Sequence, residues 1–539
     1  MTRRRFLQTA AVSPLLLQAA ALRAATDDAR AEPPRVLYSN DTTNILSCVS
    51  PFRDPKDGFT DEHLRASISE ARGADVHLLQ PGLGWIPWWK SRIYSPKDHY
   101  VKFLGEHGVT KQSAVARYLL AGGDMVRTLV DHCGSIGVKP FVSYRLNDGH
   151  HVRSLAQALK EGRPTPDMSR HSWENYPRYR LGPDPADWDQ GVFNWMIPEV
   201  REHKFALIRE LCENYAIAGL ELDFLRHWCR FPPEGTTVEQ RRAVTTGFVR
   251  RIRDVLDKTQ RGGLRRTLCI RVPAKIDIHD EQGIDLAALV AAGVDLVTLS
   301  WSYFTFQDDS VRRAKKLIPD TPVHVEMTHT TLTGKAFAGS GTQPCLRTTD
   351  AQFHTTAHLA YSQGAAGVSM FNFQYYRGHT SPKLGPFNEP PFHVLPKLKE
   401  RDFLARQPHW YFLTAARKDA ILGVQPLPAL LSRDEPHTFH IEMAPTPHHQ
   451  RDGVLRLRSD EAIADRAITV RFNGVVLNKA AHVEKPLPHP YAAFLGKPDE
   501  FQCFVCPAAG VVAGTNRIEV TVTKGMRVRV IYVDVTLPV

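Results

Sequence analysis

The sequence predicts an α/β protein in which a (β/α)8 TIM barrel is followed by a smaller all-β sandwich. Short apolar runs alternate with amphipathic helical patterns between residues 35 and 372, and the pattern changes to closely spaced short strands after Pro396. The length of 539 residues also exceeds what one hydrophobic core usually supports. We therefore expect a barrel domain over residues 32–400 and a sandwich over residues 401–539.

The N-terminus has the features of an export signal. Thr2-Arg3-Arg4-Arg5-Phe6-Leu7-Gln8 precedes an apolar run over residues 9–22 and several alanine-rich sites. This order is typical of a signal peptide, and paired arginines followed by Phe-Leu indicate the twin-arginine type. We expect residues 1–31 to be removed, the mature chain to have no membrane segment, and its location to be periplasmic or secreted.

Removal of residues 1–31 would lower the formal net charge from +11 to +8, since this segment carries five arginines and two aspartates. The basic residues are scattered, which indicates a solvated surface more than a surface adapted to an acidic polymer, and disfavours nucleic acid as a partner. The eight cysteines show no paired Cys-x-x-Cys zinc pattern. Neither a His-x-His on the first strand nor a glycine-rich phosphate loop is present, so the sequence predicts no metal and no cofactor.

Eight apolar runs have the length and composition of barrel strands. They cover residues 36–39, 76–80, 140–144, 220–224, 268–272, 296–301, 323–327 and 368–372. Helical patterns between them cover residues 61–71, 125–135, 203–215, 238–256, 286–292, 310–317 and 351–362. Glycines that fit helix C-caps stand at the junctions, among them Gly137, Gly219, Gly293 and Gly367. This alternation favours a closed barrel over an open doubly wound sheet.

Two long segments, residues 81–123 and 145–199, follow the second and third runs. They therefore extend from the C-terminal ends of strands, the face on which barrel enzymes build their sites. The C-terminal part instead reads as short strands over residues 438–442, 454–458, 467–472, 501–505, 516–522 and 526–535. With turn residues such as Asn473-Gly474 between them, these strands predict a β-sandwich.

The segment Gly219-Leu-Glu221-Leu-Asp223-Phe-Leu-Arg226-His227 is the most informative for function. Strand periodicity places its leucines and phenylalanine on the face toward the helices, so Glu221 and Asp223 project into the barrel, with Asp223 nearer the rim. A carboxylate there loses hydration and must be paired or have a use. We take Asp223 as a candidate catalytic residue, with a structural ion pair as the alternative.

The seventh run gives a parallel result, since Val323-His-Val-Glu326-Met places Glu326 on the inner rim. Its alternative role is a buried acid held by a neighbouring Arg or Tyr. Arg271 on the fifth run also points inward and, depending on the stagger of the strands, would neutralise Glu221. For Glu221 this structural pairing carries as much weight as catalysis.

Two carboxyl groups on either side of a sugar ring are what glycosidic cleavage requires. All but one of the nine tryptophans precede the sandwich, on or after the ends of four strand runs, where they suit the stacking of sugar rings. The predicted substrate-binding residues are Tyr144, Arg145, Asn147, Asp148, His150, Arg226, His227, Trp85, Trp88, Trp301, Tyr303, Asn372 and Tyr375.

Over residues 35–390 the chain resembles glycoside hydrolase-like families of exported bacterial proteins with a family 10-like barrel. The resemblance is carried by Trp195-Met-Ile-Pro-Glu199-Val-Arg201 and by residues 219–227. It implies a catalytic acid/base at the end of the fourth strand, Glu221 or Asp223, and a nucleophile at the end of the seventh, Glu326. Leu220 replaces the asparagine of that pattern, however, and Gly-x-x-x-Asp is similar to barrels in which the Asp is the nucleophile, which would leave Glu326 as the acid.

The sequence thus predicts a glycoside hydrolase that acts on a poly- or oligosaccharide through two carboxyl groups at the C-terminal mouth of the barrel. The alternative is a noncatalytic glycan-binding protein that kept the barrel and lost the chemistry. Substitution of Asp223 distinguishes the two, because a binding protein would keep its affinity.

Overall fold

A computed structural model describes residues 32–41, 45, 58–82, 86–150, 152–332, 345–378, 389–413, 426–481 and 497–539. The predicted signal peptide and Trp85 lie outside these residues. Arg35–Val539 form one compact unit. No helix in the described ranges combines the length and apolar character needed to cross a membrane.

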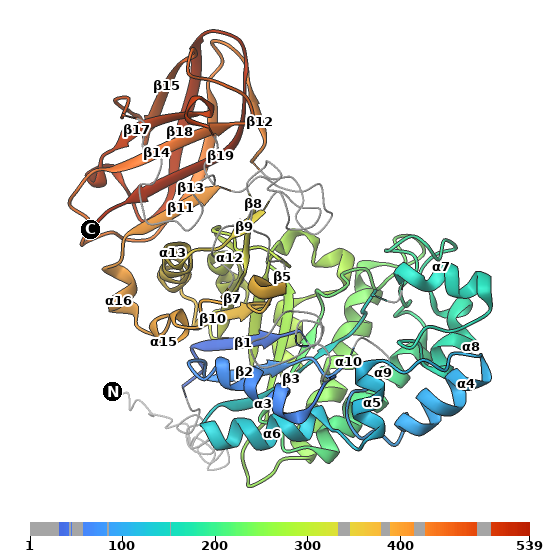
Figure 1. Ribbon diagram of the computed structural model, residues 1–539. Coiled ribbons are helices and arrows are strands. Elements are labelled where there is room, and N and C mark those ends of the chain that lie inside the picture. The colour runs from blue at the N-terminus through green and yellow to red at the C-terminus, as the bar shows by residue number, and fades with distance from the viewer. Residues whose placement is uncertain are drawn as a thin grey trace, which may run out of the picture. The chain divides into compact units, whose positions relative to one another are not determined.

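The barrel predicted from the sequence is confirmed as a closed ring of eight parallel strands (Figure 1). The strands are β1 (Val36–Asn40), β2 (Val76–Leu79), β3 (Lys139–Arg145), β4 (Gly219–Asp223), β5 (Thr267–Pro273), β6 (Leu296–Ser300), β7 (Val323–Thr328) and β10 (Gly367–Phe371). Their ring order is β1-β10-β7-β6-β5-β4-β3-β2. Each predicted run matches its strand to within one residue at either end.

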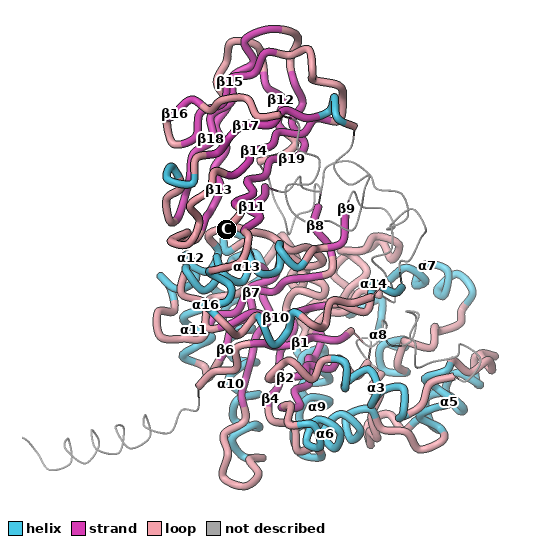
Figure 2. Tube along the Cα trace, turned by 60° about the vertical axis from the view of Figure 1, so that its left-hand side comes forward, coloured by secondary structure: helices cyan, strands magenta, loops and turns pink. Residues whose placement is uncertain are grey.

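Amphipathic helices cover the outer face of this ring (Figure 2). They are α3 (Asp61–Glu70), α6 (Met125–Ile136), α9 (Pro198–Asn214), α10 (Val238–Lys258), α11 (Leu286–Ala291), α12 (Ser310–Leu317) and α13 (Asp350–Ser362). Thr237 and Thr349 each form a capping box at the start of α10 and α13, which satisfies N–H groups that a helix leaves unpaired. The predicted helices begin and end within two residues of these bounds, except that α9 begins at Pro198, five residues before its predicted start.

The long connections after β2 and β3 hold helices that the sequence did not reveal. These are η1 (Lys97–Phe103), α4 (Leu104–Glu106), α5 (Ala114–Leu120), α7 (Val152–Glu161) and α8 (Arg170–Tyr179). After β7, β8 (Thr330–Leu332) pairs antiparallel with β9 (Cys345–Arg347). After β10 the described residues form the short helices α14 (Tyr375–Gly378), α15 (Val394–Lys397) and α16 (Arg401–Ala405).

The barrel interior has an apolar floor beneath a polar centre. Leu37, Val76, Leu78, Phe141, Cys269 and Leu296 form the apolar cluster. Gly219 leaves room for it, because a Cβ at this position would lie 2.4 Å from the Phe141 ring. Gly137 is the expected left-handed helix cap, with φ 72°. The cap prediction is wrong for Gly219 and Gly367, which lie inside strands where neighbouring atoms exclude a side chain.

The all-β part consists of two antiparallel sheets around one apolar core. The first has the order β11 (His409–Leu413), β19 (Val528–Leu537), β14 (Gly453–Ser459), β17 (Phe501–Cys506), with β12 (Ala429–Leu431) also beside β19. The second has the order β13 (His437–Met443), β18 (Gly514–Lys524), β15 (Ala467–Phe472), β16 (Val475–Val476). The six predicted strands are all present, whereas β11, β12 and β16 were not predicted.

Strand β11 also contacts the barrel helices directly. The Trp410 N–H donates to Thr355 Oγ1 of α13 at 2.7 Å, and the Gln307 side chain bonds to the backbone of Trp410 and Phe412 at 3.1 and 3.0 Å. These groups are buried, so backbone groups on the free edge of β11 find partners in the barrel domain.

A buried ion pair lies within the first sheet of the sandwich. Asp534 on β19 accepts hydrogen bonds from Arg456 Nε on β14 at 2.8 Å and from Trp410 Nε1 at 2.9 Å, and a further bond from the Arg456 terminal amine. Asp534 has no exposed area and Arg456 is 1% exposed. Neither charge has water as an alternative partner, so loss of one partner would leave the other charge buried and unpaired in the sheet.

We expect Asp534→Asn to destabilise the protein by about 3–5 kcal/mol, because the amide leaves the Arg456 charge buried without a counter-ion. Urea unfolding followed by tryptophan fluorescence measures this change. Asp465→Asn is the control, since Asp465 is 72% exposed in its pair with Arg466 and such pairs contribute little. Equal unfolding midpoints for Asp534→Asn and wild type would contradict the assignment.

Candidate functional site

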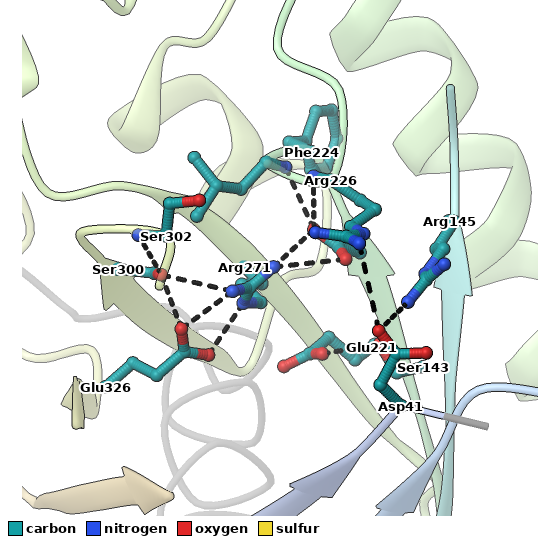
Figure 3. A network of polar contacts seen from close by, with 12 residues as sticks. Asp41, Ser143, Arg145, Glu221, Phe224, Arg226, Arg271, Ser300, Ser302 and Glu326 are labelled. Atoms are coloured by element: carbon teal, nitrogen blue, oxygen red, sulfur yellow. Dashed lines mark hydrogen bonds and ion pairs between the residues drawn. The ribbon is translucent and has the colours of Figure 1, made fainter. Parts of the chain in front are cut away.

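Arg271 of β5 lies at the centre of the barrel mouth and joins the two predicted catalytic carboxylates (Figure 3). Its Nε and Nη2 donate to Glu326 of β7 at 2.6 and 2.7 Å, as a two-pronged contact. Its Nη1 donates to both oxygens of Asp223 of β4 at 3.1 and 3.2 Å. We call Asp223, Arg271, Ser300 and Glu326 the Arg271 cluster. Strand register explains the meeting, because Asp223 and Arg271 are paired neighbours on β4 and β5.

The two oxygens of Asp223 have different surroundings. Oδ1 accepts the backbone N–H groups of Leu225 and Arg226 at 2.9 and 3.0 Å, in addition to Arg271. Oδ2 accepts from Arg271 alone among the described residues. The turn after β4 therefore fixes the orientation of the carboxylate and leaves Oδ2 with spare acceptor capacity.

Glu326 is held by Arg271 and by Ser300 at the end of β6, whose hydroxyl donates to Oε1 at 2.5 Å. Burial raises the pKa of Glu326 above its usual value, against the opposing effects of Arg271 and Ser300. Conversely, burial opposes the charge of Arg271, but Glu326 and Asp223 together raise its pKa. Arg271 therefore stays charged, and Glu326 takes up a proton more readily than a solvated glutamate does.

Glu221 lies one step below the Arg271 cluster and is not the hydrogen-bonding partner of Arg271. It accepts a bond from Ser143 of β3 at 2.7 Å. Burial, and next the charge of Asp223, raise the pKa of Glu221 to about 8. The carboxyl group is therefore neutral near pH 7. The pairing of Arg271 with Glu221 that the sequence allowed is wrong, because the register brings Arg271 beside Asp223 instead.

A second set of charged groups, which we call the mouth network, lies beside the Arg271 cluster. Arg145 of β3 pairs with Asp41 at 2.7 Å and with Asp148 at 2.5 Å. His150 Nδ1 lies 2.5 Å from Asp148, and Arg226 lies 2.8 Å from His150 Nε2. Because the Arg226 N–H also binds Asp223, the network and the cluster form one continuous polar layer.

Alternating charge stabilises this layer without solvent. Burial alone would raise the pKa of Asp148, but His150, Arg145 and Arg226 hold it well below its usual range. For Arg145 burial lowers the pKa, and Asp41 and Asp148 more than compensate. Each buried charge therefore has an opposite charge as its neighbour, which limits the desolvation cost.

Aromatic residues border the mouth network on one side. Tyr303, in the connection after β6, accepts a hydrogen bond from Arg226, whose guanidinium lies 4.9 Å from the Tyr303 ring centre. The Tyr375 ring contacts the His329 ring at a tilt of 51°, with ring centres 5.0 Å apart. Ser302 and Asn372, directly past the ends of β6 and β10, have left-handed backbone angles of 64° and 60°. Non-glycine residues in this region are uncommon and gather at functional sites.

Other predicted binding residues have structural contacts. Tyr144 lies in the apolar core, with Lys204 of α9 over its ring at 5.4 Å. Trp88 is 4% exposed within the same core. The Asn147 side chain bonds to the backbone of Phe193 and Cys229. These contacts hold loops in place.

Trp301 and His227 face away from the Arg271 cluster in their contacts. Trp301 stacks on Phe306 at 4.8 Å and lines a cavity of about 440 Å³ together with residues of the sandwich such as Glu442. His227 stacks on Trp188, with ring centres 5.6 Å apart. The sequence predicted that these residues lie at the rim of the barrel, but not the direction in which their side chains point.

Three participants were missed by the sequence analysis. Asp41 directly follows β1 and pairs with Arg145, Ser300 ends β6, and Ser143 lies on β3. Inward alternation along β6 identifies Ser300, since Leu296 and Thr298 precede it on the same face. Asp41 gave no signal, because its partner is distant in the sequence.

The reactive groups of the cluster have no solvent exposure in this structure. The side chains of Asp223 and Glu326 are both 0% exposed. A substrate that reaches them must therefore displace the groups that cover the mouth.

Neither a protein-family model nor a curated protein matches the chain. Among solved structures it is similar to a class V chitinase from Pseudomonas fluorescens Pf-5, with 14% identity, coverage of 68% of this chain and 100% of that chain, and a TM-score of 0.36. It is also similar to α-L-fucosidase isoenzyme 2 from Paenibacillus thiaminolyticus, with 11% identity, coverage of 68% of this chain and 49% of that chain, and a TM-score of 0.39. A third similar structure is catalytic domain 2 of a group II chitinase from Ostrinia furnacalis, with 11% identity, coverage of 68% of this chain and 97% of that chain, and a TM-score of 0.38.

The raised pKa of Glu221 predicts how stability depends on pH. Between the ordinary value of 4.5 and the folded value of about 8, the folded chain keeps a proton that the unfolded chain loses. The free energy of unfolding therefore falls as pH rises through this window, by up to about 1.4 kcal/mol per pH unit from this group.

Glu221→Gln mimics the protonated form and keeps the acceptor for Ser143. We expect this variant to lose the pH dependence that Glu221 contributes. Its free energy of unfolding relative to that of wild type, measured by urea unfolding, should therefore increase from pH 5 to pH 8. Glu461→Gln, at an exposed carboxylate, is the control. A constant difference between Glu221→Gln and wild type across that range would show that Glu221 is ionised in the folded protein.

Proposed function

We propose that this chain is a glycoside hydrolase that acts on a poly- or oligosaccharide at the C-terminal mouth of the barrel. The observation that carries the proposal is the convergence of Asp223 and Glu326, from opposite sides of one guanidinium group, at the ends of β4 and β7. Glycosidic cleavage needs one carboxyl group to protonate the leaving oxygen and another to attack the anomeric carbon or activate water.

The contacts favour Asp223 as the nucleophile or base and Glu326 as the acid. Asp223 keeps Oδ2 available while backbone N–H groups fix Oδ1. Glu326 has the raised pKa, so it takes up the proton that an acid must supply. In the resting state both act as anions toward Arg271, and protonation of Glu326 requires it to loosen one of its two contacts. As the proton moves to the leaving oxygen, Arg271 and Ser300 stabilise the carboxylate that forms.

The aromatic residues of the mouth support a sugar ligand. Tyr303 and Tyr375 offer flat faces beside the charged layer, and Asp148, His150 and Arg226 offer hydrogen-bonding groups for hydroxyls. This combination of flat rings with charged, well-oriented donors and acceptors suits the two faces of a pyranose ring.

A noncatalytic glycan-binding protein is the second candidate, and one observation favours it. Both carboxylates are fully buried and paired with Arg271, which is also the arrangement of a structural ion network. In that case the mouth would bind glycan through its rim and the carboxyl groups would never meet the glycosidic bond.

For its location, we propose export by the twin-arginine route to the periplasm or beyond. The support is the N-terminal sequence alone, with Thr2-Arg3-Arg4-Arg5-Phe6-Leu7-Gln8 before an apolar run. A folded barrel that reaches a polysaccharide outside the cytoplasmic membrane fits this route.

We expect Asp223→Asn and Glu326→Gln each to lower turnover by about 10²–10⁴-fold, since the amides can neither attack nor exchange protons. The mature chain is first assayed on a panel of polysaccharides and aryl glycosides, and the variants are then compared on the substrate found. Asp277→Asn is the matched control, because this carboxylate belongs to the barrel but is 61% exposed.

Full activity in Asp223→Asn would refute the two-carboxylate mechanism. If the panel shows binding without turnover, and Asp223→Asn binds the same glycan equally well, the noncatalytic candidate replaces the hydrolase.

We expect replacement of Arg3, Arg4 and Arg5 by lysine to abolish export, with the unprocessed chain retained in the cytoplasm. Cell fractionation followed by mass determination of the N-terminus measures this. Arg23→Lys, which changes a basic residue outside the arginine run, should leave export unchanged. Equal export of the triple variant and wild type would contradict a twin-arginine signal.

A further inference from the structure

Within the described part of the chain, three potential metal ligands converge beside the barrel mouth. They are Asp189, His227 and Cys229, whose ligand atoms all lie within 4.8 Å of one another. His227 Nε2 is 3.7 Å from Asp189 Oδ1. Ligands of a tetrahedral zinc ion, each about 2.0–2.3 Å from the metal, are separated by roughly 3.3–3.8 Å, so small movements would bring the three groups to bonding distance.

The backbone after β4 presents His227 and Cys229 on one side. Trp228, between them, packs with Leu225 and Ile278, which turns the two flanking side chains in the opposite direction. Asp189 comes from the long connection after β3. There the Asp187 side chain accepts the N–H groups of Asp189 and Gln190 at 2.9 Å each, so a local turn fixes the position of the carboxylate.

His227 is oriented before any ion binds. Its ring stacks on Trp188 with an interplanar angle of 21°, and Nε2 lies 2.7 Å from the Trp188 carbonyl oxygen. A Cβ on Gly149 would lie 2.5 Å from the ring, so glycine is needed for the close approach of that loop. The imidazole therefore has one available orientation, with Nε2 toward Asp189.

The backbone also fixes the position of Cys229. Its carbonyl accepts a bond from Asn147 at 2.6 Å, so the residue is held where its side chain lies near Asp189 and His227.

We propose that Asp189, His227 and Cys229 form a zinc site that fastens the connection after β3 to the connection after β4. Thiolate, imidazole and carboxylate together select zinc over magnesium or calcium, which prefer oxygen ligands alone. The Trp188 carbonyl oxygen or a water molecule supplies the fourth position. The sequence analysis predicted no metal because the ligands come from two connections and match no zinc motif.

Binding is balanced by the release of one proton. The Cys229 S–H bond breaks, its proton goes to solvent and the thiolate bonds to zinc. Neutral His227 keeps one proton, which moves from Nε2 to Nδ1 as Nε2 becomes the ligand. No oxidant or further reactant is needed.

The site would stiffen the loops that carry the mouth network. Asp148 and His150 begin the connection that contains Asp189, and Arg226 directly precedes His227. Zinc would thus keep these groups in register with Asp223, through structure rather than through contact with substrate. The inference is independent of the hydrolase proposal, because metal content and affinity are measured without any substrate.

The test uses the full mature chain, treated with EDTA, repurified and titrated with zinc chloride against a chromophoric chelator. We expect one zinc per chain, and one proton released per zinc in calorimetry across buffers of different ionisation enthalpy. Cobalt(II) should give a thiolate-to-cobalt charge-transfer band. Asp189→Ala should weaken zinc binding by at least about 10-fold and Cys229→Ser by about 100-fold, and Cys229→Ser should also lose the band and the proton release.

Two variants serve as matched controls. Cys133→Ser removes a buried thiol elsewhere in the barrel domain, and Asp184→Asn changes an exposed carboxylate of the same connection; both should bind zinc as wild type does. Asp189→Ala decides the question even if Cys229→Ser does not fold, because Asp189 is 55% exposed. Failure of the wild type to retain zinc, or equal zinc affinity in Asp189→Ala and wild type, would overturn the proposal.

Discussion

The contact of Arg271 with Asp223 and Glu326 is the interaction on which the rest of the barrel mouth depends. Two fully buried carboxylates, Asp223 of β4 and Glu326 of β7, share the guanidinium group of Arg271 on β5. None of the three charged groups has water as an alternative partner. Loss of Arg271 would leave two carboxylates uncompensated beside neutral Glu221. The same contact that makes the centre stable also keeps both carboxylates in fixed positions, which is what a reaction on a sugar ring requires of them.

The barrel was predictable because its signals are local. A strand buried on both faces reads as a short apolar run, so strand boundaries agreed to within one residue. A helix between strands reads as a 3.6-residue period, and helix boundaries agreed to within two residues except at the start of α9, which begins five residues before the predicted start. Packing between distant segments was not predictable in this way. Gly219 and Gly367 looked like helix caps, yet their role depends on Phe141 and Arg35, which lie beside them at the neighbouring strands β3 and β1. Strand β11 was missed because its backbone and side chains are completed by barrel helices.

The candidate site was predictable as a set of positions and less so as a set of partners. Strand alternation alone placed Glu221, Asp223, Arg271 and Glu326 in the interior, which is where they lie. The stagger of neighbouring strands, which no single sequence specifies, decided that Arg271 meets Asp223 rather than Glu221. Asp41 meets Arg145 because β1 and β3 lie on either side of β2 in the ring, which the sequence does not specify. Residues on loops, such as Trp301, were placed at the rim with no indication of direction.

If a glycosidic bond is placed between Asp223 and Glu326, a crystal structure of Glu326→Gln with a bound oligosaccharide will show it. We expect an opened mouth in which the anomeric carbon faces Asp223 Oδ2, the leaving oxygen faces the amide at position 326, and Arg271 retains its bond to Asp223. An oligosaccharide bound only on the rim, with Asp223 and residue 326 still buried around Arg271, would contradict this placement and make the barrel a glycan-binding scaffold.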